Sequence, residues 1–170
     1  GCLAILVAAE PPGDLCALAL LAPALTLRGN AALYRHLFRH RWVSRLVPMV
    51  DKGAMDVSDE QVKREAPYLG RLPTRAAAQL HRVIEGAKEA LPQVRTPAIV
   101  LWGARDAVVP RRAAERAAKE IGSGPARLAV FPRSAHQLAL DVEREAVAAE
   151  VARFFSVFVR AQAPAERAGG

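Results

Sequence analysis

Two residues of this sequence have the types and spacing that acid–base chemistry requires. Asp106 lies in the stretch GARDAVVP, and His136 lies in PRSAH, 30 positions further on (136 − 106). A carboxylate beside an imidazole can keep one ring nitrogen protonated and leave the other free to accept a proton. The pair is therefore a candidate acid and base, provided that the surrounding elements bring the two side chains together.

Short apolar runs bounded by glycine or proline precede both residues. The run PAIVLWG (97–103) leads to Asp106, and RLAVF (127–131) leads to His136. A similar run, LCALALL, covers residues 15–21. Continuous apolar runs of this length are typical of strands that are buried on both faces of a parallel sheet. The sequence therefore predicts three such strands.

The stretch between the two polar loops predicts a connecting helix. Residues 111–122 (RRAAERAAKEIG) favour a helix, and Gly122 is placed to cap its C-terminus. Strand, helix and strand in this order predict two adjacent parallel strands, about 4.8 Å apart. Loops that leave the same edge of such strands lie close together, so we expect Asp106 to contact His136.

Two further helices are expected at the ends of the chain. Residues 2–9 are small and apolar, as in a buried helix. Residues 142–159 carry an apolar stripe, and Asp141 is placed to cap the first turn of that helix. Residues 161–170 are expected to form a disordered tail.

Residues 28–91 interrupt this alternation of strands and helices. A helix is expected to start at Asn30, a looser stretch covers residues 48–73, and Thr74 is expected to cap another helix. A crossover between parallel strands needs only about a dozen residues. The surplus predicts an all-helical cap over the strand ends, where open parallel sheets bind ligands. The alternative is a decorated connection without a role in binding.

Composition limits the classes of function. The formal net charge is +7, but the arginines are scattered and no basic run alternates with aromatic residues, so nucleic-acid binding is not expected. Cys2 and Cys16 form no CxxC motif, which suits a reducing compartment, and we expect a cytoplasmic protein. No apolar run reaches the roughly 18 residues that a membrane span needs, so stable membrane insertion is not expected.

Four stretches together resemble the C-terminal part of the α/β-hydrolases. The chain is most similar to the small-capped carboxylesterase and monoacylglycerol lipase group of serine hydrolases. The stretches are LALLAPAL (18–25), EAPYLGRLP (65–73), TPAIVLWGARDAVVP (96–110) and FPRSAHQLALDVERE (131–145). The resemblance implies that Asp106 is the acid and His136 the base of a catalytic triad. Asp141 matches the acidic residue that follows the histidine in that family.

The resemblance also implies an architecture and a reaction. The fold class is α/β: three parallel strands flanked by helices, with a helical cap insertion. Residues 1–27 and 92–160 would form the core, without its N-terminal strands, and residues 28–91 the cap or lid. The implied reaction is hydrolysis of a small-molecule carboxylic ester through an acyl-enzyme. No cofactor and no metal are implied.

The sequence departs from the family in one respect. The family nucleophile is a serine in G-x-S-x-G, and no such motif occurs in these 170 residues. Gly1 is expected to match the last glycine of the motif, so that the chain begins just past its nucleophile. The free ring nitrogen of His136 would then face Gly1, and the chain alone would be inactive. The serines without the motif's context are Ser44, Ser58, Ser123, Ser134 and Ser156.

Alternatives remain open at this stage. The fold could support other hydrolase chemistry or acyl transfer, or it could serve a non-catalytic binding module. His36 and His40 have the spacing of a metal site, but Leu37 stands where the zinc-protease pattern requires glutamate. Cap residues could line an acyl pocket or simply pack on the core: Tyr34, Leu37, Phe38, Trp42 and Met49. The oligomeric state is left open.

Overall fold

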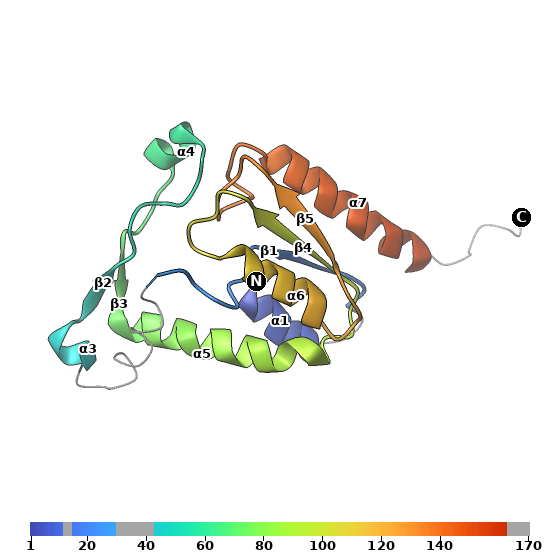
Figure 1. Cartoon of the computed structure of the whole chain (residues 1–170), viewed down its shortest axis with the longest axis horizontal. Coiled ribbons are helices and arrows are strands. Elements are labelled where there is room, and N and C mark those ends of the chain that lie inside the picture. The colour runs from blue at the N-terminus through green and yellow to red at the C-terminus, as the bar shows by residue number, and fades with distance from the viewer. Residues whose placement is uncertain (12–14, 30–42, 163–170) are drawn as a thin grey trace, which may run out of the picture.

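The predicted parallel sheet is present in the computed structural model, which describes residues 1–11, 15–29 and 43–162 (Figure 1). Its three described strands are β1 (Leu18–Leu21), β4 (Ala98–Gly103) and β5 (Arg127–Phe131). The strands lie in the order β1-β4-β5, and both pairings are parallel. Each strand falls within one of the predicted apolar runs, so the prediction of three parallel strands is confirmed.

Strand β4 is buried on both faces because it lies between the other two strands. Ala98, Val100 and Trp102 belong to one hydrophobic cluster, whereas Ile99 and Leu101 belong to another. Successive side chains of a strand point to opposite faces of the sheet, and here each face has its own helical cover. This two-sided burial explains why the run has no polar residue in alternate positions.

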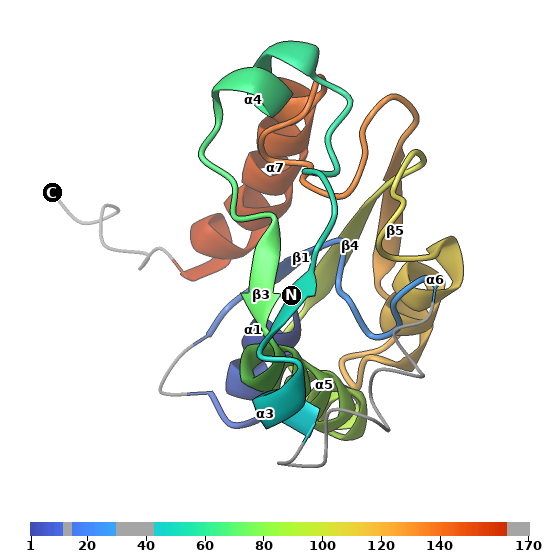
Figure 2. The same ribbon diagram turned by 90° about the vertical axis from the view of Figure 1, so that its left-hand side faces the viewer.

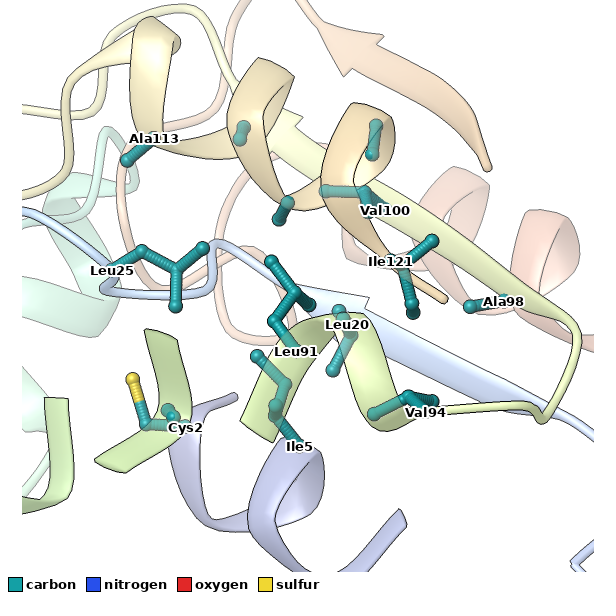
Figure 3. Close-up of a cluster of buried hydrophobic side chains, with 14 of the residues drawn as sticks. Cys2, Ile5, Leu20, Leu25, Leu91, Val94, Ala98, Val100, Ala113 and Ile121 are labelled. Atoms are coloured by element: carbon teal, nitrogen blue, oxygen red, sulfur yellow. The ribbon is translucent and has the colours of Figure 1, made fainter. Parts of the chain in front are cut away.

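Four described helical elements cover the first face. They are α1 (Cys2–Ala9), α5 (Thr74–Ala90), the short 3-10 helix η1 (Leu91–Gln93) and α6 (Arg111–Glu120). Figure 3 shows the core beneath them, where Ile5, Leu20, Leu91 and Val100 are fully buried. Only small residues of α6 enter this cluster, so the helix lies close to the sheet: Ala113, Ala114, Ala117 and Ala118.

A single described helix, α7 (Arg144–Gln162), covers the opposite face (Figure 1). Val147, Val151 and Phe154 of α7 pack against Ile99 and Leu101 of β4 and their neighbours. These three positions follow the helical repeat, so they form one apolar stripe. The predicted C-terminal helix is confirmed, although it begins at Arg144 and continues to Gln162, into the stretch expected to be disordered.

The expectation of an all-helical segment at residues 28–91 was wrong. Besides α5, the described part of this segment holds two short helices, α3 (Val43–Leu46) and α4 (Glu60–Glu65), but β2 (Met49–Asp51) and β3 (Arg71–Pro73) pair as antiparallel strands. Gly53, whose φ is 75°, and the nearby prolines break helical periodicity, so the backbone groups pair across the ladder.

The elements from α3 to β3 form an arm, residues 43–73, which lies beyond the carboxyl ends of the strands of the parallel sheet. In Figure 1 the arm lies on the side toward which the arrowheads of β4 and β5 point. Figure 2 shows α4 beside the N-terminal end of α7, and the Arg144 guanidinium donates a 3.0 Å hydrogen bond to the Asp59 carboxylate there. The helix expected from Asn30 lies outside the described residues, apart from its last turn, α3.

Helix α5 begins at Thr74, but Thr74 does not cap it as predicted. The residue before the helix is Pro73, and the Thr74 hydroxyl instead donates to the carbonyl of Val47 in the arm. The far end of α5 belongs to the core, because Ile84 and Ala87 join the cluster on the first face. Helix α5 thus connects the arm with the sheet.

Gly122 does not cap α6 through a left-handed conformation as expected. The C-terminal capping residue is Ile121, with φ of −63°. The Gly122 N–H donates to the Leu91 carbonyl at 3.1 Å, and a Cβ on Gly122 would lie 2.0 Å from the Pro92 carbonyl oxygen. Glycine is therefore needed for close approach between two chain segments rather than for a helix cap.

Among the described residues, no helix is both long and apolar enough to cross a membrane.

Candidate active site

The site is built on two loops that leave the carboxyl ends of β4 and β5. Backbone hydrogen bonds join the loops immediately beyond the strands. The Ala104 N–H donates to the Phe131 carbonyl at 2.9 Å, and the Arg105 N–H donates to the Ser134 carbonyl at 3.0 Å. The parallel pairing of the strands is thus extended into the loops. Because of these hydrogen bonds, the loop segments that carry Asp106 and His136 lie side by side.

The two predicted residues are in contact. His136 Nδ1 lies 3.0 Å from Asp106 Oδ2. The Asp106 side chain is fully buried, whereas the His136 side chain is 26% exposed. An ionised carboxylate can only accept, so beside one Nδ1 would donate and Nε2 would be the ring nitrogen able to accept a proton. This is the arrangement of an oriented general base.

The orientation of the Asp106 carboxylate is set by the loop itself. Its Oδ1 accepts hydrogen bonds from the N–H groups of Val108 at 2.8 Å and Val109 at 2.6 Å. Trp102 supports the same turn, because its indole N–H donates to the Val109 carbonyl at 3.0 Å. One carboxylate oxygen is therefore bound by the backbone, and the other is left for His136.

Gly103, the last residue of β4, permits the close approach of the two loops. A Cβ at this position would lie 2.4 Å from the carbonyl oxygens of both Ser134 and Ala135. In the sequence this glycine marks only the end of an apolar run. Its packing role depends on a segment some thirty residues away, so no local pattern could have revealed it.

Asp141 holds the loop that carries His136. Its side chain is completely buried, and Oδ2 accepts from the Ala135 N–H at 2.6 Å. Oδ1 accepts from Ser58 at 2.8 Å, from Asp59 at 3.0 Å and from Val142 at 2.7 Å. The prediction that Asp141 caps the first turn of the last helix was wrong, because α7 starts three residues later and its first turn is not bonded to this carboxylate.

Ser134 and Glu143 form a second tie within the same loop. The Ser134 hydroxyl donates to Glu143 Oε2 at 2.8 Å, and the Arg133 N–H donates to the same oxygen at 2.9 Å. Ser134 is fully buried. Its hydroxyl is thus committed to shaping the loop, as expected for a serine outside a nucleophile motif.

Asp56 of the arm is a site residue that sequence analysis missed. Its Oδ2 accepts from the Ala107 N–H at 2.9 Å and from the His136 N–H at 3.2 Å, and its carbonyl accepts from Gln137 at 3.2 Å. It therefore contacts both of the loops that carry Asp106 and His136. The surrounding stretch GAMDVSDE carries no spacing or motif that distinguishes Asp56 from the other acidic residues of the arm.

The remaining candidates from the sequence do not join this site in the described structure. Cys2, one of the two cysteines outside any CxxC motif, is buried in α1, and burial raises the pKa of its thiol, so it is a packing residue. Within residues 1–11, 15–29 and 43–162, no group of three or more potential ligands could hold a metal ion. Met49 lies in β2 and is half-buried. The residues outside the described part of the chain are Tyr34, His36, Leu37, Phe38, His40 and Trp42.

Comparison with known proteins agrees with this architecture. Residues 1–143 match the profile of the family described as "Serine aminopeptidase, S33". Solved structures with the same fold include one from a study of LipS and LipT, two metagenome-derived lipolytic enzymes. It is 24% identical, with a TM-score of 0.78, and the match covers 92% of this chain and 61% of that one. No protein of curated function matches the sequence.

Two monoacylglycerol lipases have similar structures. The enzyme of Paleococcus ferrophilus is 17% identical with a TM-score of 0.72, and the match covers 91% of this chain and 63% of that one. A soluble variant of the Saccharomyces cerevisiae monoglyceride lipase, in complex with a substrate analogue, is 11% identical with a TM-score of 0.73. The match covers 92% of this chain and 58% of that one. At these identities the likeness establishes the fold, and the chain spans about three fifths of each relative's length.

Proposed function

The chain belongs to the S33 serine aminopeptidase family of α/β-hydrolases, and from this membership we propose that Asp106 and His136 are the acid and base of a serine hydrolase that cleaves carboxylic esters. The observation that carries the proposal is the 3.0 Å contact between His136 Nδ1 and Asp106 Oδ2. The fixed orientation of the Asp106 carboxylate and the partial exposure of His136 support it.

In the proposed mechanism, His136 Nε2 takes the proton of a serine hydroxyl as that oxygen attacks the ester carbonyl. The resulting imidazolium is stabilised by Asp106, and it then protonates the departing alcohol. Water repeats the sequence on the acyl-enzyme and releases the acid. The nucleophile and the donors of the oxyanion hole are proposed to come from outside these 170 residues, since no G-x-S-x-G motif occurs within them.

We propose esters as the substrates because the similar structures named above are described as lipolytic enzymes or monoacylglycerol lipases. Peptide hydrolysis is the second candidate, because the matching family is described as an aminopeptidase family.

We propose that the arm is part of a lid over the strand ends, since Asp56 and Asp141 join it to both loops. The free cysteines Cys2 and Cys16 support the expected cytoplasmic location.

The proposal is tested by substitution in the protein that carries this chain, with the isolated chain as a negative control. His136→Ala and Asp106→Asn are each expected to lower kcat for p-nitrophenyl butyrate by about a thousandfold or more, because the base or its orientation is lost. His81→Ala, in α5, serves as the matched histidine control and should leave kcat unchanged. Aminoacyl p-nitroanilides tested in parallel identify a peptidase. Wild-type kcat in the His136→Ala enzyme would refute the proposed role.

A further inference from the structure

Asp56 occupies an unusual position relative to the His136–Asp106 pair. No hydrogen bond joins its carboxylate to either side chain of the pair, yet one of its oxygens accepts from the backbone of both loops, at Ala107 and at His136 itself. Ala107 directly follows Asp106. The carboxylate thus bridges the backbone positions that determine where the acid and the base stand.

The backbone of Asp56 is itself held firmly. Its neighbours Met55 and Val57 are 8% and 2% exposed, so both flanking side chains are buried. Two and three residues further on, the N–H groups of Ser58 and Asp59 donate to the buried Asp141 carboxylate. A side chain mounted on an anchored backbone can impose a position on its partners, whereas a side chain on a loose loop cannot.

Hydrogen bonds between a carboxylate and backbone N–H groups are stronger than those between neutral groups. Two donors that share Oδ2 must remain close to each other, which limits how far the loops can separate. Without this acceptor, the Ala107 and His136 N–H groups lose their partner in the protein. The loops would then be free to shift, and a misplacement of about 1 Å can lower the rate of a reaction about a hundredfold.

We propose that Asp56 is a positioning residue for the His136–Asp106 pair, which it holds in register by bridging the two loops from the arm. The inference rests on the proposed function only for its kinetic consequence. Its structural content, that Asp56 maintains the His136 Nδ1–Asp106 Oδ2 hydrogen bond, stands independently of any reaction.

Kinetics in the protein that carries this chain provide the first test. Asp56→Ala is expected to lower kcat for p-nitrophenyl butyrate by about tenfold or more with KM nearly unchanged, because positioning acts on the transition state. Asp56→Asn should remain within about threefold of wild type, since its amide oxygen still accepts both bonds, though less strongly. Asp51→Ala is the matched control, because this exposed carboxylate of the arm accepts a local hydrogen bond from the Gly53 N–H, and within the described residues it is not bonded to either loop of the pair.

A spectroscopic measurement provides the second test and needs no activity. The Nδ1 proton of His136, observed by NMR with 15N-labelled histidine, should shift upfield or broaden in Asp56→Ala and remain unchanged in Asp56→Asn and Asp51→Ala. If Asp56→Ala does not fold, Asp56→Glu replaces it, because the added methylene displaces the carboxylate without removing it. An unchanged Nδ1 signal and unchanged kcat in the folded variant would overturn the inference.

The two tests separate this inference from the proposed function. If the wild-type protein hydrolyses esters and Asp56→Ala leaves both kcat and the Nδ1 signal intact, the positioning role fails and the function stands. If the wild-type protein hydrolyses no ester but Asp56→Ala changes the Nδ1 signal, the function fails and the positioning role stands.

Discussion

At the residue scale, four acidic side chains organise the candidate site by accepting from backbone N–H groups: Asp56, Asp106, Asp141 and Glu143. Where the backbone pairing of the two loops ends, the remaining backbone donors need other partners, and side-chain oxygens can supply them. An ionised carboxylate suits this purpose because it offers two oxygens and no donor. The same bonds compensate the carboxylates of Asp106 and Asp141 for their removal from water.

Substitution of Gly103 is expected to displace the loop that carries His136 and so to disturb the His136–Asp106 pair. In Gly103→Ala, the new Cβ would meet two backbone carbonyls at 2.4 Å, and these atoms cannot give way without moving the loop that carries His136. We expect a loss of about 1–3 kcal/mol in the free energy of unfolding, as for other overpacked sites. Urea denaturation measures the stability, and the NMR signal of His136 Nδ1 reports the displaced loop.

Gly86→Ala is the matched control. There the new Cβ would lie 3.4 Å from the end of the Leu6 side chain, which can adjust, and alanine favours a helix interior over glycine by about 0.5–1 kcal/mol. Equal stability losses in the two variants would show that crowding at Gly103 has been misjudged.

At the element scale, the short helix α4 depends on Asp59. The Asp59 carboxylate accepts from the N–H groups of Gln61 at 3.0 Å and Val62 at 3.2 Å, and it pairs with Arg144 of α7. Its position is that of an N-cap, which satisfies donors at the start of a helix. The bond from the Val62 N–H, assisted by Arg144, holds the pKa of Asp59 below its ordinary value of 3.8.

This lowered pKa predicts how α4 responds to acid. Because the pKa of Asp59 is lower in the folded state, its contribution to stability is present above 3.8 and is lost as pH falls through the lowered folded value. Amide hydrogen exchange should show protection at Gln61 and Val62 that persists on acidification and falls only below 3.8. In Asp59→Asn the acid-dependent step should be absent. A loss of protection near neutral pH would contradict this assignment.

At the scale of the whole molecule, β4 lies between two separate hydrophobic clusters, and each cluster holds one layer of helices to the sheet. Leu101 is fully buried in the cluster beneath α7. Leu101→Ala is expected to lower the free energy of unfolding by about 2–5 kcal/mol, because it removes buried methyl groups and leaves a cavity. Urea denaturation measures the loss.

Leu69→Ala in the arm serves as the comparison for that variant, because Leu69 is 81% exposed. Its effect should stay within about 0.5 kcal/mol, as for other surface substitutions. Similar losses in both variants would mean that α7 contributes little to holding the sheet.

Much of the α/β core could be predicted from the sequence because its signals are local. The apolar runs that became β1, β4 and β5 end at glycines or prolines, and the alanine-rich stretch between β4 and β5 favours a helix. Contact between Asp106 and His136 follows from these elements, since residues just beyond adjacent parallel strands meet at one edge of the sheet.

Only the tertiary structure assigned Asp56 and Asp141 to the site and showed Gly103 and Gly122 to be points of close approach. Asp56 and Asp141 bond to backbone groups about 80 residues away, and the two glycines meet segments about thirty residues away. Strand pairing in the arm was missed for the same reason, because β2 and β3 are each only three residues long and stabilise one another. Periodicity and breaker residues describe a chain's neighbours in sequence, whereas these contacts exist only once folding has brought distant backbones within hydrogen-bonding distance.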